Sequence, residues 1–109
     1  TDSVIPVADR GELNAFLAAQ AILSPVVVMV SGAAKWAGSH GGDTDKAERF
    51  LRRLIASSLS GMPSDDLITA LNTPDGYNQR LRQYFEQQGL SANIDTGLSK
   101  LNPPTGKDA

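Results

Sequence analysis

Hydrophobic and polar positions divide the chain into helix-like stretches around one run of valines. Asp9 stands three residues ahead of Glu12, a capping pattern that predicts the start of a helix. Apolar residues at helical spacing continue that helix to Leu23. Residues 25–30 are Pro-Val-Val-Val-Met-Val, and because consecutive β-branched residues favour strands over helices, we expect a buried strand there. The alternative is an apolar helix from residue 25 to residue 37.

Two further helices are predicted with clear ends. The first begins at the cap Asp45, closes at Gly61 and carries a continuous apolar stripe, namely Ala47, Phe50, Leu51, Leu54, Ile55 and Leu59. The second begins at Thr73 with a proline in its first turn and ends at Gly89. Residues 64–71 between them fit a short helix and a buried strand equally well. A β-like stretch at residues 4–7 is interrupted by a proline and suits the edge of a sheet.

These elements predict an α/β fold, a small single-domain sheet with flanking helices. An all-α chain of four to five short helices is the alternative. A length of 109 residues suits one compact domain, which we place at residues 1–90. Residues 91–109 are rich in glycine and small polar residues and contain two adjacent prolines, so we expect a flexible polar tail there.

Composition excludes several classes of function. The chain has no cysteine, which rules out disulfides, thiol nucleophiles and thiolate metal sites. The valine run is far shorter than the roughly 20 apolar residues that a bilayer requires, so we expect a soluble chain without membrane contact. A net charge of −2 argues against a dedicated nucleic-acid-binding domain. We expect no cofactor, no metal and no catalytic residue.

The order of the predicted elements resembles the first part of a thioredoxin-like domain. Residues 36–40 are Trp-Ala-Gly-Ser-His, placed after the valine run and ahead of a helix, where that family carries Trp-Cys-Gly-Pro-Cys. The resemblance covers about residues 4–90 and implies a sheet of the thioredoxin type. It does not carry redox activity to this chain, because Ala37 and His40 stand where the family has its two cysteines.

A few side chains stand out as candidates for function. Trp36 lies beside Lys35 in a glycine-rich stretch, and tryptophan is enriched at binding hot spots, so these two are our interface candidates. His40 is the sole histidine and is followed by Asp43; we expect an exposed loop histidine rather than a base or a metal ligand. The candidates for nucleic-acid or anion binding are the basic residues Lys46, Arg49, Arg52, Arg53, Arg80 and Arg82.

The sequence therefore predicts a non-catalytic protein–protein interaction or assembly module rather than an enzyme. A small sheet leaves an exposed edge, and pairing two such edges in a twofold homodimer is a common remedy. The module would act as a dimer or as an accessory subunit of a larger particle. The alternative is an auxiliary nucleic-acid-binding protein that uses the basic helix faces, with weak and salt-sensitive affinity.

Overall fold

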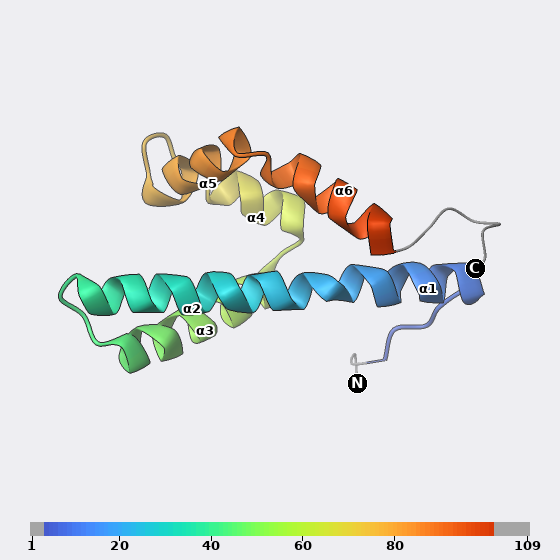
Figure 1. Cartoon of the computed structure of the whole chain (residues 1–109), viewed down its shortest axis with the longest axis horizontal. Helices are drawn as coiled ribbons and strands as arrows, with labels where there is room; N and C mark the ends of the chain where they lie inside the picture. The colour runs from blue at the N-terminus through green and yellow to red at the C-terminus, as the bar shows by residue number, and fades with distance from the viewer. Residues whose placement is uncertain (1–3, 102–109) are drawn as a thin grey trace.

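Helices form nearly all of the regular structure in this protein. The computed structural model describes residues 4–101, and this part holds six α-helices, one 3₁₀ turn and no strand. In chain order they are α1 (Arg10–Ala19), η1 (Gln20–Ile22), α2 (Leu23–Ser39), α3 (Thr44–Gly61), α4 (Ser64–Ala70), α5 (Tyr77–Gln87) and α6 (Leu90–Leu101). In Figure 1, α1, η1 and α2 form one long rod, with α5 and α6 on one side of it and α3 emerging on the other.

The α/β fold expected from the sequence is wrong for residues 4–101, and the all-helical alternative is the class observed. The residues expected as a strand, 25–30, lie inside α2. A lone strand leaves its backbone N–H and C=O groups without ladder partners, whereas a helix pairs them internally. Each valine costs only a few tenths of a kcal/mol in a helix, less than the roughly 1–3 kcal/mol of an unpaired buried backbone group.

Pro25 does not break the long rod because the 3₁₀ turn absorbs its effect. Proline has no N–H to donate to the carbonyl four residues earlier, at Ala21, and its ring crowds that carbonyl. The residues around Ala21 adopt the tighter 3₁₀ geometry, and the α-helix resumes at Leu23. The valine run therefore continues the preceding helix instead of starting a new element.

The other predicted helices are present with shifted boundaries. Asp9 caps α1 as expected, accepting a 2.9 Å hydrogen bond from the Glu12 N–H. The cap of α3 is Asp43, which accepts a 2.8 Å bond from the Lys46 N–H, and not Asp45. Residues 64–71, for which a helix and a strand are equally expected, are helical as far as Ala70 and form α4 (Ser64–Ala70). The last long helix of the prediction begins at Tyr77 rather than at Thr73, because residues 73–76 form a turn.

The segment expected to be a tail is helical through α6 as far as Leu101. Gly89 separates α5 from α6 with a φ of 91°, in the left-handed region that glycine adopts without strain. The expected domain boundary at residue 90 thus falls at a turn between two helices. Residues 102–109 lie outside the described residues.

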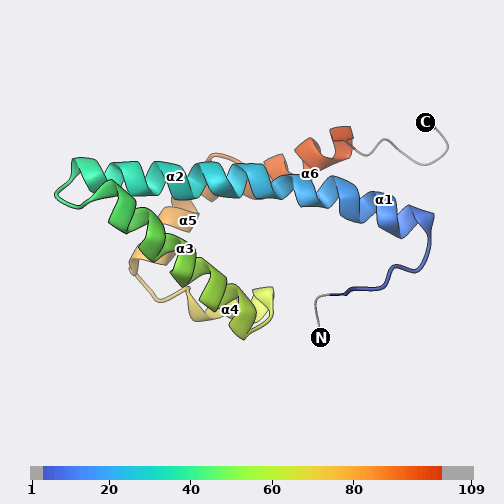
Figure 2. The same ribbon diagram turned by 90° about the horizontal axis from the view of Figure 1, so that it is seen from below.

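The best-packed part of the fold is the hairpin of α2 and α3. Figure 2 shows α3 starting beside the end of α2 and diverging from it along its length. The close approach depends on Gly38, since a Cβ there would lie 3.1 Å from Thr44 Cβ and 3.3 Å from its backbone nitrogen. Ala34, one turn earlier on α2, is 1% exposed.

Burial elsewhere is sparse. Ala34 is the one buried residue among residues 4–101. The radius of gyration is 16.9 Å, against about 13 Å expected for a compact domain of this length. The helices are therefore formed and connected, but the described part of this single chain does not enclose a hydrophobic core.

We predict opposite effects for two glycine substitutions in α2. Gly38→Ala forces a Cβ against Thr44 and should lower the free energy of unfolding by about 1–3 kcal/mol. Gly32→Ala is the matched control, because nothing lies within 4 Å of its added Cβ, and it should raise stability by about 0.5–1 kcal/mol. Urea unfolding followed by circular dichroism measures both. Equal effects at the two sites would contradict the close α2–α3 packing.

Candidate functional site

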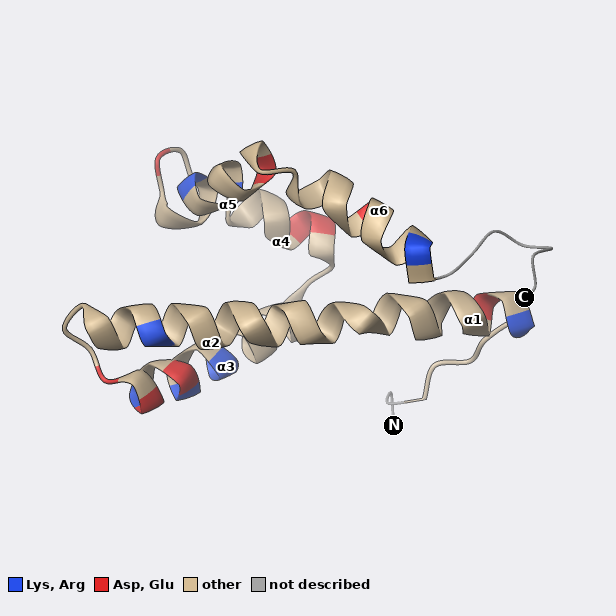
Figure 3. Ribbon diagram, in the orientation of Figure 1, with Lys and Arg blue, Asp and Glu red and all other residues tan. Residues whose placement is uncertain are grey.

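The most unusual surface of this protein is the long rod of α1, η1 and α2. Residues 13–34 contain no charged side chain, and Figure 3 shows the rod tan between its charged ends. Large apolar side chains on it face solvent, with both Leu23 and Val28 67% exposed. By length and composition, the helix Arg10–Ser39 could cross a membrane. A helix that is apolar on all sides belongs inside a larger apolar environment.

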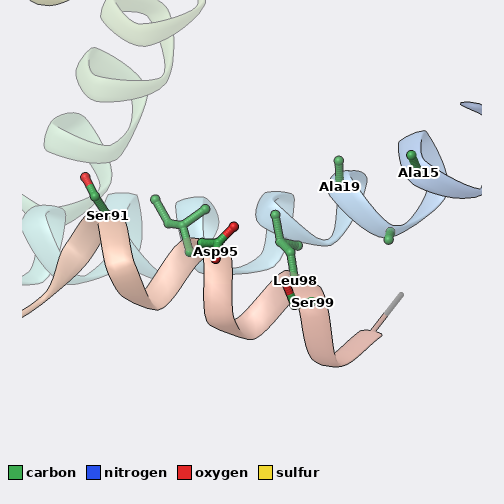
Figure 4. A pocket seen from close by; sticks show the side chains of 8 residues that line it. Ala15, Ala19, Ser91, Asp95, Leu98 and Ser99 are labelled. Atoms are coloured by element: carbon green, nitrogen blue, oxygen red, sulfur yellow. The ribbon is translucent and has the colours of Figure 1, made fainter. Parts of the chain in front are cut away.

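α6 covers part of α1 through small side chains. Ala15, Ala18 and Ala19 of α1 lie opposite Ile94 and Leu98 of α6, with polar residues of α6 at the margins of the contact. Figure 4 shows Leu98 and Asp95 extending from α6 toward the long rod. The alanines allow the two helices to approach, but they offer little side-chain surface to bury. This end of the molecule is therefore only lightly covered.

An open groove lies between α2 and the α5–α6 pair, and we call it the apolar groove. It has a volume of about 680 Å³. Val26 and Met29 contribute from α2, Phe85 from α5, and Ile94 and Leu98 from α6. Most of its other lining residues are also apolar, and the polar ones include Gln88 and Asn93. A groove of this lining suits an apolar occupant better than a polar substrate.

Exposed apolar side chains continue onto the shorter helices. Phe50 and Leu54 of α3, both in the predicted apolar stripe, remain largely exposed. Tyr77 and Tyr84 of α5 are 87% and 56% exposed. The aromatic side chains of α5 that could join a core are therefore left largely in solvent by the single chain.

Trp36 and Lys35 stand at the end of the long rod. Trp36 is 64% exposed and stacks on His40, with ring centroids 4.1 Å apart and an interplanar angle of 15°. The His40 Nδ1 lies 2.8 Å from the Trp36 carbonyl oxygen, at the C-terminal end of α2. This contact gives His40 a helix-capping role. Of the two interface candidates, Trp36 is therefore part of a stacked aromatic pair on the surface, and Lys35 precedes it in the chain.

The six basic candidates do not form one surface. Lys46, Arg49, Arg52 and Arg53 belong to α3, whereas Arg80 and Arg82 belong to α5, and these two helices make no substantial contact. Arg52 pairs with Glu48 at 3.0 Å, and Arg82 donates to the Asn72 side chain at 3.3 Å. The separation of the two groups weakens the case for a continuous track along a phosphate backbone.

Comparison with known proteins gives no family assignment. No protein-family model matches the chain, no curated protein matches it, and no solved structure matches it. Among residues 4–101, no three side chains of His, Cys, Asp or Glu come together as metal ligands could. The uncovered apolar surface is therefore the feature from which we argue function.

Part of this surface was readable from the sequence. The charge-free stretch at residues 13–34 is visible in the printed chain, but dividing it at Ser24-Pro25 concealed its full length. The expectation of no membrane contact considered the valine run alone, and that run is now part of a 30-residue helix. The residues that line the apolar groove come from separate helices, so no local sequence pattern predicts the groove.

One carboxylate fixes the turn between α5 and α6. Glu86 accepts hydrogen bonds from the Ser91 N–H at 3.1 Å and from the Ser91 hydroxyl at 2.7 Å. These bonds, assisted by the charge of Arg82, hold the pKa of Glu86 below its ordinary value of 4.5. Because the charged form makes the contact, its contribution to stability is present above pH 4.5 and is lost as the pH falls through the lowered pKa.

We predict that the Ser91→Ala substitution raises the pKa of Glu86 part of the way toward 4.5, since it removes the hydroxyl donor, the largest cause of the lowered pKa, and keeps the backbone N–H of residue 91. An NMR titration of the Glu86 side chain measures this pKa directly. Ser99→Ala, on the same helix, is the control and should leave the pKa unchanged. A Glu86 pKa that does not respond to Ser91→Ala would contradict the described turn.

Proposed function

We propose that this protein is a non-catalytic helical assembly module that completes its hydrophobic core by associating with a second copy of itself. The observation that carries the proposal is the near absence of burial in residues 4–101, where Ala34 alone is buried. The helices display apolar side chains that one chain does not cover. Covering a valine, leucine or phenylalanine fully contributes about 1.5–3 kcal/mol, so a partner gains from each one it covers.

The exposed area supports a large interface. The chain exposes 8949 Å², whereas a compact monomer of 11.5 kDa exposes about 5,800 Å². Obligate dimers bury about 2,000–5,000 Å² in total, or roughly half of that per chain. The excess of about 3,000 Å² per chain is therefore comparable to, and somewhat above, the upper end of that class. A single ordinary interface of about 800 Å² per partner would leave most of it uncovered.

The charges next to the rod favour protein over lipid as its cover. α3 packs along α2 and carries Lys46, Arg49, Arg52 and Arg53, while α6 brings Asp95 close to α1. A charged side chain at the centre of a bilayer costs at least about 2.5–3.5 kcal/mol. In the described arrangement, lipid around the rod would surround these flanking helices as well. A helical partner covers the apolar faces and leaves the charges in water.

We predict that the full chain forms a species of at least twice 11.5 kDa as its concentration rises. Size-exclusion chromatography with light scattering measures the mass. The association should persist in high salt, because burial of apolar surface is strengthened by salts such as sulfate while surface charge attraction is screened. A strict monomer at every concentration, with helical circular dichroism, would contradict the proposal.

Membrane anchoring is a second candidate, favoured by one specific observation, the length of the apolar helix. The charge-free residues 13–34 would extend about 33 Å as a helix, against about 30 Å for the hydrocarbon core of a bilayer. Lys35 and Trp36 follow directly, and both residue types occur where helices leave a bilayer. This candidate requires α6 and the far end of α3 to move away from the rod.

Flotation with neutral phosphatidylcholine vesicles separates the two candidates. We predict that the full chain stays in the dense fractions as a self-associated species. Flotation that resists high salt, and that Val28→Lys abolishes, would favour the membrane anchor, because Val28 lies inside the charge-free stretch.

A further inference from the structure

We propose that the second copy of the chain binds in the apolar groove between α2 and the α5–α6 pair. This inference rests on the proposed self-association and names the surface through which it occurs. The groove is a concave apolar surface that joins residues from both ends of the described chain, with Met29 on one wall and Leu98 on the other. An apolar side of a helix can enter such a groove without leaving polar groups unpaired.

The groove exists because α6 touches the rod at one end only. At α1 the small side chains of Ala15 and Ala19 let α6 approach, so the two helices are in contact there. At α2 the contact is replaced by open space bordered by Val26, Met29 and Phe85. The bonds from Ser91 to Glu86 fix the turn that sets the angle between α5 and α6. The opening is therefore bordered by α2 on one side and by the α5–α6 pair on the other.

The lining indicates what kind of occupant fits. Its polar side chains include Gln88 and Asn93, and the Asn93 amide already donates to the Gln88 carbonyl oxygen at 3.5 Å. Among residues 4–101, none of those that line the groove is charged. A charged substrate would lose its hydration there without gaining a partner. An apolar helix face loses little favourable hydration when it enters the groove. This same chain exposes apolar helix faces of that kind.

The excess exposed surface of the chain is of a size that a second copy could cover. Each chain offers both a concave groove and exposed helix faces, so a twofold arrangement covers two grooves in one interface. The excess exposed area of about 3,000 Å² per chain is of the size that an interface of the obligate class covers, and a second copy of the chain can supply such an interface. A short peptide in the groove would leave most of that area in water.

Aspartate substitutions on and off the groove test the proposal. Met29→Asp and Leu98→Asp place a carboxylate in the groove and should weaken the dimer at least about tenfold, since a buried unpaired charge is costly. Gln83→Asp is the control, because Gln83 is an exposed polar residue of α5 that does not line the groove. It should change the dissociation constant by less than about threefold. Sedimentation equilibrium on the full chain gives the constants.

The outcomes separate the groove from the self-association itself. A wild-type chain that stays monomeric overturns both proposals. A wild-type dimer that the two groove variants leave intact overturns the groove alone. Helical circular dichroism of each variant identifies a loss of folding.

Two single-cysteine variants test the groove without introducing a charge. The native chain has no cysteine, so each variant carries one thiol. Gly97→Cys lies in the groove and Gly32→Cys lies outside it, and an added Cβ meets nothing within 4 Å at either position. Modification of the Gly97→Cys thiol by iodoacetamide should slow at least about fivefold as the dimer forms, because the second copy excludes the reagent. The Gly32→Cys thiol should react at an unchanged rate. Protection of Gly32→Cys alone, or of neither, would overturn the proposal.

Discussion

The structure depends on the continuation of the helix past Pro25, where a 3₁₀ turn accommodates the hydrogen bond that proline cannot donate. The 3₁₀ turn at Gln20–Ile22 lets α1 and α2 share one axis, and this joins two apolar segments into a single rod. A break at Ser24 would have given two short helices able to fold onto each other. Because the rod is long and continuous (Figure 2), its two halves do not cover one another. The uncovered surface follows from that constraint.

Two of the remaining helices, α3 and α6, pack against the rod, one closely and the other lightly. α3 packs closely because Gly38 and Ala34 present small surfaces at the α2–α3 turn. α6 packs lightly on the alanines of α1, and the α5–α6 turn holds it at an angle that leaves the apolar groove open. Small residues therefore decide where helices meet, and larger apolar residues such as Val26, Met29 and Phe85 are left facing open space. The same division of residue types produces both the fold and the candidate interface.

The sequence predicted local features well and long-range ones poorly. The cap at Asp9 and the turn at Gly89 depend on a few neighbouring residues, and both are present. The intrinsic preference of the valine run favours a strand, but a strand also needs a partner for its backbone N–H and C=O groups. No second strand forms among residues 4–101, so helix formation prevails there. The groove and the exposure of Tyr77 depend on angles between helices, which no local pattern encodes.

The most direct test of the account is an NMR experiment on a mixture of isotope-labelled and unlabelled chains, filtered for contacts between the two. The account predicts intermolecular contacts to the methyl groups of Val26 and Met29, because the second copy lies in the groove that they line. Observation of contacts within single chains only, at concentrations where the protein is fully helical, would contradict it.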